Sequence, residues 1–274
     1  MQNYLTIDVE DYFQVDAFSD IVSSKDWGAL EQRAPNSMAV ILQMLKKHRV
    51  HATFFVVGWL AEKHPEIVSA IVEHGHEIGC HSYWHRKVYE LTPETFREDT
   101  LRAKAVLETL SNKKVTAYRA PSYSITRESL WALGILKEAG FTTDSSIFPI
   151  THDTYGIPDA PRFRYEVHGL GIVEFPISTA LFFGRRIPVS GGGYFRLFPY
   201  WFTKKALKRI NNRERQPFVF YIHPWEIDSD QPRFKGARLL SRFRHYNNLH
   251  KTRARFERLL NDFDFVPLPV NSRG

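Results

Sequence analysis

Residues 76–85 read HEIGCHSYWH, a short apolar strand candidate that runs directly into two histidines four positions apart. Upstream, residues 52–57 (ATFFVV) form another buried-strand run. Between the two, Pro65 opens a stretch with apolar residues at helical spacing, which ends at Gly75. This order of strand, helix and strand predicts a parallel α/β fold.

The alternation continues outward in both directions. Helices are expected to begin at Pro35 and at Pro93, which follows the N-cap candidate Thr92. Residues 237–260 predict one long basic amphipathic helix. Further strands are predicted at residues 4–8, 115–121, 141–146, 171–178, 218–225 and 263–268.

The chain shows no repeat and no low-complexity linker, so we predict a single domain over residues 1–274. Its core is expected at residues 3–226. Residues 147–200, rich in Pro, Gly and aromatic residues, are expected to form an elaborated insertion, and residues 227–274 a C-terminal extension.

Composition excludes several classes of protein. With 43% hydrophobic and 24% charged residues, the chain is typical of a soluble globular protein, and it lacks an apolar run long enough to span a membrane. The first residues, MQNYLTIDVEDYF, do not resemble a signal peptide. The single cysteine, Cys80, excludes an intrachain disulfide and fits a reducing compartment. We therefore expect a cytoplasmic protein.

The net charge of +7 is unevenly distributed, because residues from Trp201 onward hold 16 Lys and Arg against 7 Asp and Glu. This basic segment predicts either a solvated helix face or peripheral contact with an anionic surface such as the inner membrane. No nucleic-acid motif accompanies the charge, so nucleic acid is not an expected partner. The oligomeric state is left open by the sequence.

Acidic residues follow the first predicted strand at Asp8, Glu10 and Asp11. Active sites of α/β barrels lie at this end of the strands, although Asp is also common in ordinary turns. His81 and His85, placed on a helical turn, would present both imidazoles on one face. Together with a carboxylate they could hold a divalent metal and leave positions open for water and substrate, but H-x-x-x-H alone is a weak signal.

Two further residues end predicted strands. Arg119 could hold a catalytic carboxylate in place, or be a surface arginine before a rigid turn. His223 suits general acid chemistry, or a structural role. The run Gly191–Gly192–Gly193, followed by Tyr194, is expected either to let the backbone approach a sugar or to form a hairpin turn.

Four motifs in order resemble one known family, the polysaccharide deacetylases with a NodB-homology domain (carbohydrate esterase family 4). The resemblance covers residues 3–226 and implies a distorted (β/α)7 TIM-like barrel with an elaborated insertion and a C-terminal helix. The motifs are TIDVED (6–11), HSYWH (81–85), RAPS (119–122) and YIHP (221–224). A finer similarity, to a cytoplasmic subgroup associated with exopolysaccharide loci that accompany an exosortase system, rests on DVEDYFQV (8–15), GGGYFRLFPY (191–200), HPWEID (223–228) and FRHYNNL (243–249).

The resemblance implies metal-dependent hydrolysis of an acetamido group on an N-acetylhexosamine unit of a polysaccharide or its lipid-linked precursor. On the matching positions, Asp8 is the catalytic base and His223 the catalytic acid. Arg119 holds Asp8 in place. Predicted substrate-binding residues are Ser122 through its backbone N–H, together with Tyr123, Asp144, Tyr194 and Trp225. Asp144 is also the nearest candidate for a hydrogen-bond partner of His223.

The resemblance further implies one divalent ion held by Glu10, His81 and His85, with zinc expected first and cobalt, nickel or manganese as alternatives. The family's first motif usually has two adjacent aspartates, whereas the acids here are spaced, so Asp11 remains an alternative to Glu10. Two other functions stay open. One is a related C–N hydrolase acting on a small cyclic amide or imide, and the other is a non-catalytic glycan-binding protein.

Overall fold

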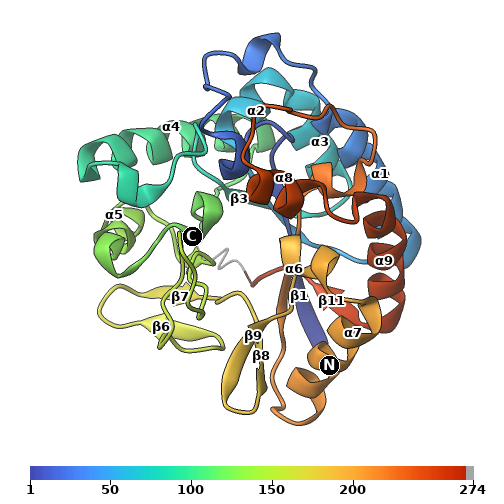
Figure 1. Cartoon of the computed structure of the whole chain (residues 1–274). Coiled ribbons are helices and arrows are strands. Elements are labelled where there is room, and N and C mark those ends of the chain that lie inside the picture. Colours follow the sequence, from blue (N-terminus) through green and yellow to red (C-terminus); the bar gives the residue numbers. More distant parts are fainter. Residues whose placement is uncertain (270–274) are drawn as a thin grey trace.

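The computed structural model describes residues 1–269 and consists of a curled, mostly parallel sheet with helices on its outer side (Figure 1). Its strand order is β10-β1-β2-β3-β4-β5-β7-β6, with β11 also paired to β1, and only β6 and β7 pair antiparallel. The strands are β1 (Gln2–Val9), β2 (Thr53–Val56), β3 (Glu77–Cys80), β4 (Ala117–Tyr118), β5 (Thr143–Asp144), β6 (Tyr165–Val167), β7 (Ile172–Glu174), β10 (Val219–Ile222) and β11 (Asp264–Val266).

Two of the parallel strands, β2 and β10, are buried along their whole length, which is four residues in each. Parallel strands covered on both faces need such continuous apolar runs, which is why ATFFVV and FVFYI are strong strand signals. The mixed α/β half barrel that results confirms the predicted fold class.

Helices follow the strands at the predicted positions. Proline opens α1 and α3 within their first turn, and Thr92 caps α4 through its side chain. These helices on the outer side are α1 (Ala34–His48), α2 (Gly58–Lys63), α3 (Pro65–Glu73), α4 (Pro93–Ser111) and α5 (Trp131–Glu138). Short 3-10 turns precede α1 at Asp16–Phe18 and Trp27–Ala29. Others precede α4 at Val88–Glu90 and α5 at Pro121–Tyr123 and Arg127–Ser129.

The segment between β7 and β10 builds the side of the molecule where the sheet stays open. It contains a two-stranded hairpin, β8 (Thr179–Phe182) and β9 (Arg185–Pro188), followed by α6 (Gly192–Leu197) and α7 (Tyr200–Asn212). Gly191 forms an isolated parallel bridge with Tyr221 of β10. Among residues 1–269, no ladder joins β6 to β10, so the barrel is incomplete.

The prediction of one helix over residues 237–260 is wrong. The chain forms α8 (Leu239–Tyr246) and α9 (Leu249–Asp262), separated at Asn248, which is left-handed with φ 54°. Asparagine tolerates this conformation better than most residues, and its side-chain amide donates to the carbonyl of Arg196. A 3-10 turn (Pro224–Ile227) connects β10 to this C-terminal part. No helix in residues 1–269 is long and apolar enough to cross a membrane.

Candidate active site

Four parallel strands, β10, β1, β3 and β4, bring the predicted chemical groups to one edge of the sheet, with β2 lying between β1 and β3. Asp8 lies near the end of β1, while His81, Arg119 and His223 directly follow β3, β4 and β10. Because the carboxyl ends of parallel strands meet at one edge, residues more than 200 positions apart in the sequence become neighbours there. The side chains of this edge are almost entirely buried.

Glu10, His81 and His85 form a cluster with metal-binding geometry. One ligand atom from each lies within 4.8 Å of the others, and Glu10 Oε2 is 2.5 Å from His85 Nε2. Glu10 Oε2 is buried and has no hydrogen-bond partner. An unpartnered buried carboxylate oxygen facing imidazole nitrogens is what a divalent cation would satisfy. The residues present therefore fit the implied ion.

The two histidines do not lie on a helical turn, contrary to the prediction. Residues 81–85 form an irregular loop in which Ser82 and His85 are left-handed, with φ 59° and 51°. The buried carboxylate of Asp99 on α4 accepts hydrogen bonds from the backbone N–H groups of Tyr83 and Trp84, and this holds the loop. Left-handed non-glycine residues cost free energy and concentrate at functional sites.

His81 is fixed as a neutral ligand by its surroundings. Its Nδ1 donates to the carbonyl oxygen of Arg119 at 2.7 Å, so Nε2 remains the free acceptor. Burial lowers the pKa of His81 to about 4, although Asp8 and Glu10 oppose this shift. For Glu10, burial would raise the pKa, but His85 and His223 hold it well below its usual value. The cluster thus combines a neutral imidazole with an ionised carboxylate.

Asp8 is held by Arg119, which is fully buried. Nη1 of Arg119 donates to Asp8 Oδ1 at 2.6 Å and to Thr6 Oγ1 at 2.7 Å. The rest of the guanidinium donates to the backbone carbonyl and the hydroxyl of Ser145. Since the Arg119 carbonyl also orients His81, this one residue positions both the predicted base and a predicted ligand.

His223 lies at the open side of the site. Its Nε2 is 3.5 Å from Glu10 Oε1 and 3.9 Å from Asp8 Oδ2. Its Nδ1 is 3.2 Å from Glu226 Oε2. Burial would lower the pKa of His223, but Glu10 and Glu226 raise it to about 9, so the imidazole is protonated at neutral pH. A protonated imidazole beside an acceptor carboxylate suits general acid chemistry.

Sequence reasoning missed Glu226 and Arg196. Glu226 accepts the backbone N–H of His223 at 3.0 Å and pairs with Arg196 Nε of α6 at 2.7 Å. Both side chains are buried, and a buried carboxylate needs such a partner. The sequence offers one signal for this pair, an acid three residues after His223. Nothing in the sequence links Glu226 to Arg196, which lies 30 positions upstream.

Asp144 does not reach His223. It accepts from Ser146 Oγ at 2.6 Å and lies opposite Glu174 in the β5–β7 register. Burial and the neighbouring Asp144 raise the pKa of Glu174 well above its usual value, so Glu174 is the protonated member of this pair. The contact to His223 that the sequence suggested for Asp144 is made by Glu226 instead.

Asp11 is engaged away from the metal-binding cluster. Its carboxylate accepts the backbone N–H groups of Arg33 and Ala34, where α1 begins, and that of Tyr12. These bonds satisfy donors that the helix start leaves free. The geometry therefore favours Glu10 over Asp11 as a ligand.

The other predicted site residues differ in what their side chains contact. Trp225 is buried, and its indole N–H donates to Glu10 Oε1 at 3.0 Å, so its observed contact is with a predicted ligand. Tyr123 Oη is 3.5 Å from Asp8 Oδ2, and Ser122 beside it is left-handed with φ 53°. Tyr194 is half-buried on α6 and packs near Phe148.

The glycine run serves packing within the chain. A Cβ on Gly191 would lie 2.1 Å from the carbonyl oxygen of Tyr221, and one on Gly192 would lie 2.3 Å from the Tyr221 hydroxyl. The run therefore allows the start of α6 to approach β10. The run opens α6 and does not form a hairpin turn, and a role in sugar binding stays a prediction.

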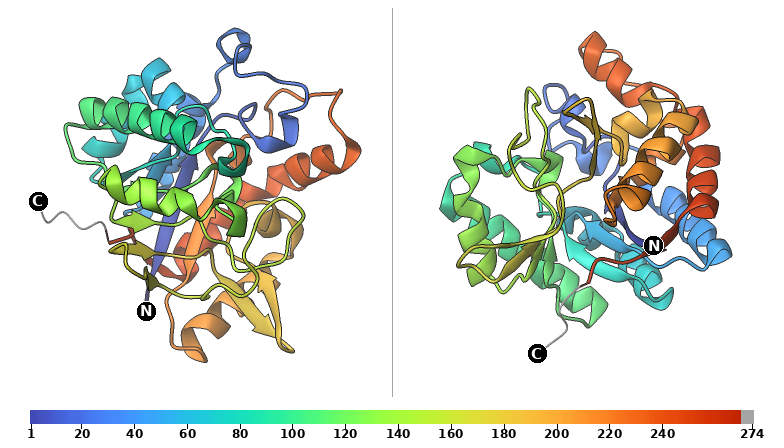
Figure 2. Two further views of the ribbon diagram at one scale, coloured as in Figure 1. Left: turned by 90° about the vertical axis from the view of Figure 1, so that its left-hand side faces the viewer. Right: turned by 90° about the horizontal axis from the view of Figure 1, so that it is seen from below.

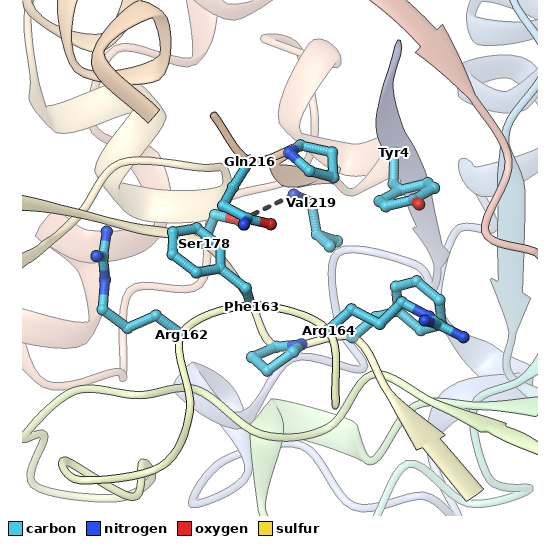
Figure 3. A pocket seen from close by; sticks show the side chains of 10 residues that line it. Tyr4, Arg162, Phe163, Arg164, Ser178, Gln216 and Val219 are labelled. Atoms are coloured by element: carbon cyan, nitrogen blue, oxygen red, sulfur yellow. Dashed lines mark hydrogen bonds between the residues drawn. The ribbon is translucent and has the colours of Figure 1, made fainter. Parts of the chain in front are cut away.

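A separate hollow lies at the opposite end of the strands. Figure 3 shows Tyr4, Arg162 and Arg164 around it, with the Val219 N–H donating to Ser178 Oγ. Tyr4 and Val219 lie early in β1 and β10, whereas Asp8 and His223 lie at the far ends of those strands. This hollow contains none of the clustered acids and histidines, so the chemistry belongs to the other edge.

A parallel α/β half barrel with a His–His–carboxylate cluster at its carboxyl edge defines a class of protein suited to metal-assisted chemistry. Residues 22–143 match the family model described as polysaccharide deacetylase. This match confirms the family resemblance for residues 22–143, which contain the second and third of the four motifs. Residues 145–270 match a second model, described as a domain of unknown function (DUF3473). The site draws His81 and Arg119 from the first region and His223 from the second.

Similar proteins agree with this assignment. The peptidoglycan-N-acetylglucosamine deacetylase of Bacillus cereus is 37% identical over 93 residues, which are 34% of this chain and 34% of that protein. The chain spans about a third of the length of the first curated relatives that it matches.

Two solved structures share the fold. A crystal structure of a proposed polysaccharide deacetylase from Mycobacterium smegmatis superposes with a TM-score of 0.58 at 19% identity, covering 97% of this chain and 86% of the other. A family 4 carbohydrate esterase from Streptomyces lividans gives a TM-score of 0.51 at 14% identity, covering 96% and 91%.

Proposed function

We propose that the protein is a metal-dependent deacetylase that removes N-acetyl groups from N-acetylhexosamine units of a glycan. The observation that carries this proposal is the meeting of Glu10, His81 and His85 around an unpartnered carboxylate oxygen, directly beside Asp8 and His223. We treat residues 1–274 as one catalytic unit, because both matched regions contribute to this site.

Glu10, His81 and His85 would hold the ion, with Trp225 orienting Glu10. A divalent ion bound there supplies Lewis acidity, which polarises a carbonyl and lowers the pKa of water. Zinc is the first candidate because it accepts nitrogen and oxygen ligands in an open three-residue site, and cobalt, nickel and manganese suit the same donors.

Asp8 takes the proton from the water that attacks the acetyl carbonyl. Arg119 holds Asp8 aimed at the site through the 2.6 Å hydrogen bond. The backbone N–H of Ser122 is proposed to stabilise the oxyanion, since such a donor contributes on the order of 3 kcal/mol. Tyr123 and Tyr194 are proposed to contact the sugar.

His223 donates a proton to the leaving amine as the C–N bond breaks, which frees acetate and a hexosamine. Burial lowers the pKa of His223, whereas Glu226, which is not one of the proposed metal ligands, raises it and so favours the protonated form. Glu226 supports that state and is itself held by Arg196. Glu226 and Arg196 are positioning residues, because they act through His223.

The glycan is proposed to be an exopolysaccharide or its lipid-linked precursor, met on the cytoplasmic side of an anionic membrane. The relative from Bacillus cereus carries N-acetylglucosamine in its name, which supports the sugar class. The excess of Lys and Arg beyond residue 200 supports a place next to anionic lipid.

Metal removal tests this function against the cyclic amide hydrolase and the non-catalytic binder. Protein purified without added metal should contain about one divalent ion per chain, as expected for a single three-residue site. It should release acetate from N-acetylglucosamine oligomers, lose that activity to a chelator and regain it with zinc. Cyclic imide hydrolysis that survives chelation would favour the first alternative, and glycan binding without acetate release the second.

A further inference from the structure

Helix α8 turns its apolar side chains outward. Leu239, Leu240 and Phe243 are 81%, 58% and 55% exposed. Phe243 lies three positions after Leu240 and four after Leu239, spacings that place side chains next to each other on one side of a helix. Of the eight residues of α8, only His245 is buried. We call Leu239, Leu240 and Phe243 the α8 patch.

Positive charge surrounds the α8 patch. Residues 231–256 contain eight Lys and Arg and no Asp or Glu. Arg233, Lys235 and Arg238 are exposed just before the patch. In the described residues, two of these eight cations contact an acid, Arg238 with Asp20 and Arg244 with Asp153, and both contacts are exposed. Such surface pairs contribute little, so the positive field remains.

We propose that α8 docks the protein on an anionic lipid surface, with the α8 patch in the interfacial layer and the surrounding cations on the headgroups. Apolar side chains set in a basic ring match the chemistry of such a surface. A second copy of this chain fits poorly, because a two-fold contact through the α8 patch would bring the two basic rings against each other.

The docking helix is directly connected to the site. His245 of α8 stacks on Trp225 with ring centroids 4.2 Å apart, and Trp225 stacks on His223 at 5.0 Å. Both views in Figure 2 show α8, in orange-red, at the edge of the molecule. Docking through α8 would therefore bring the catalytic edge close to the lipid surface. That consequence rests on the proposed function, whereas lipid binding itself does not.

Vesicle co-sedimentation tests the proposal. The purified protein should bind vesicles of phosphatidylcholine mixed with phosphatidylglycerol, bind pure phosphatidylcholine vesicles far less, and detach as salt is raised. The double substitution Leu239→Asp and Phe243→Asp should weaken binding about a hundredfold, since each buried apolar side chain contributes roughly tenfold. The matched control is Leu101→Asp, which changes a leucine 43% exposed on α4 and should leave binding unchanged.

Two charge-reversal variants test the electrostatic part of the proposal. Arg233→Glu with Lys235→Glu should weaken binding to anionic vesicles, while Lys113→Glu with Lys114→Glu, on exposed residues after α4, should not. The proposal is overturned if the wild type does not bind anionic vesicles at low salt, or if the Leu239→Asp, Phe243→Asp variant binds them as the wild type does. It is also overturned if the wild type is a dimer in solution and this variant is a monomer. Vesicle binding without acetate release would leave docking standing and remove the proposed function.

Discussion

Replacing Trp225 by phenylalanine should weaken metal binding while preserving the fold. The indole N–H donates to Glu10 Oε1 at 3.0 Å, and the ring lies stacked between His223 and His245, tilted by 19° and 14°. Phenylalanine keeps an aromatic ring in this stack and removes the donor. Glu10 then loses its hydrogen bond from the indole and keeps its contacts with His85 at 2.5 Å and His223 at 3.5 Å.

The size of the effect follows from the nature of the hydrogen bond. A hydrogen bond to an ionised group contributes about 1.5–3 kcal/mol, which corresponds to roughly ten- to a hundredfold in a dissociation constant. Loss of a partner of a metal ligand lowers metal affinity over about the same range. We therefore expect zinc to bind Trp225→Phe about ten to a hundred times more weakly.

Competition with a chromophoric chelator measures this affinity without relying on activity. The control is Trp27→Phe, which removes the same atoms from a buried tryptophan packed against Trp59. Wild-type zinc affinity in Trp225→Phe would refute the idea that the indole supports the ligand. An equal loss in Trp27→Phe would show that general packing is responsible.

Two further substitutions test the surroundings of His223 and the glycine run. In the metal-free protein, the raised pKa of His223 stabilises the fold by about 3 kcal/mol at pH values below about 6.5, and this contribution is lost as pH rises through about 9. In urea unfolding, Glu226→Gln should therefore show a smaller loss of stability over this pH range than the wild type. An unchanged loss would argue against Glu226 as its cause. Gly191→Ala should lower the free energy of unfolding by about 3 kcal/mol or more, because its Cβ meets the Tyr221 carbonyl oxygen, and wild-type stability would contradict the close approach.

Much of the fold was predictable because its signals are local. Buried runs such as ATFFVV predict parallel strands, and Pro65 and Pro93 mark helix starts by chemistry that needs no distant partner. Parallel strands also carry their carboxyl ends to one edge. From that rule alone, Asp8 and His223 are expected to lie close together, and the structure shows that they do. Their catalytic roles stay predictions.

The rest depended on contacts that the sequence does not display. The left-handed Ser82 and His85 give the histidine loop its shape, and Ser82 carries no sequence signal for that conformation. The pairing of Arg196 with Glu226 joins α6 to the 3-10 turn that follows β10, two elements 30 positions apart in the sequence. The break at Asn248 depends on a hydrogen bond to a backbone carbonyl 52 positions away. Each of these features is fixed by tertiary structure.

Acetate release by the zinc-loaded protein tests the central claim most directly. We expect the wild type to release acetate from N-acetylglucosamine oligomers. Asp8→Asn, which keeps the shape of the side chain, should lower the rate by a factor of about a hundred or more, because a general base contributes at least that much. Full activity in Asp8→Asn, or no acetate release by zinc-loaded wild type, would contradict the account.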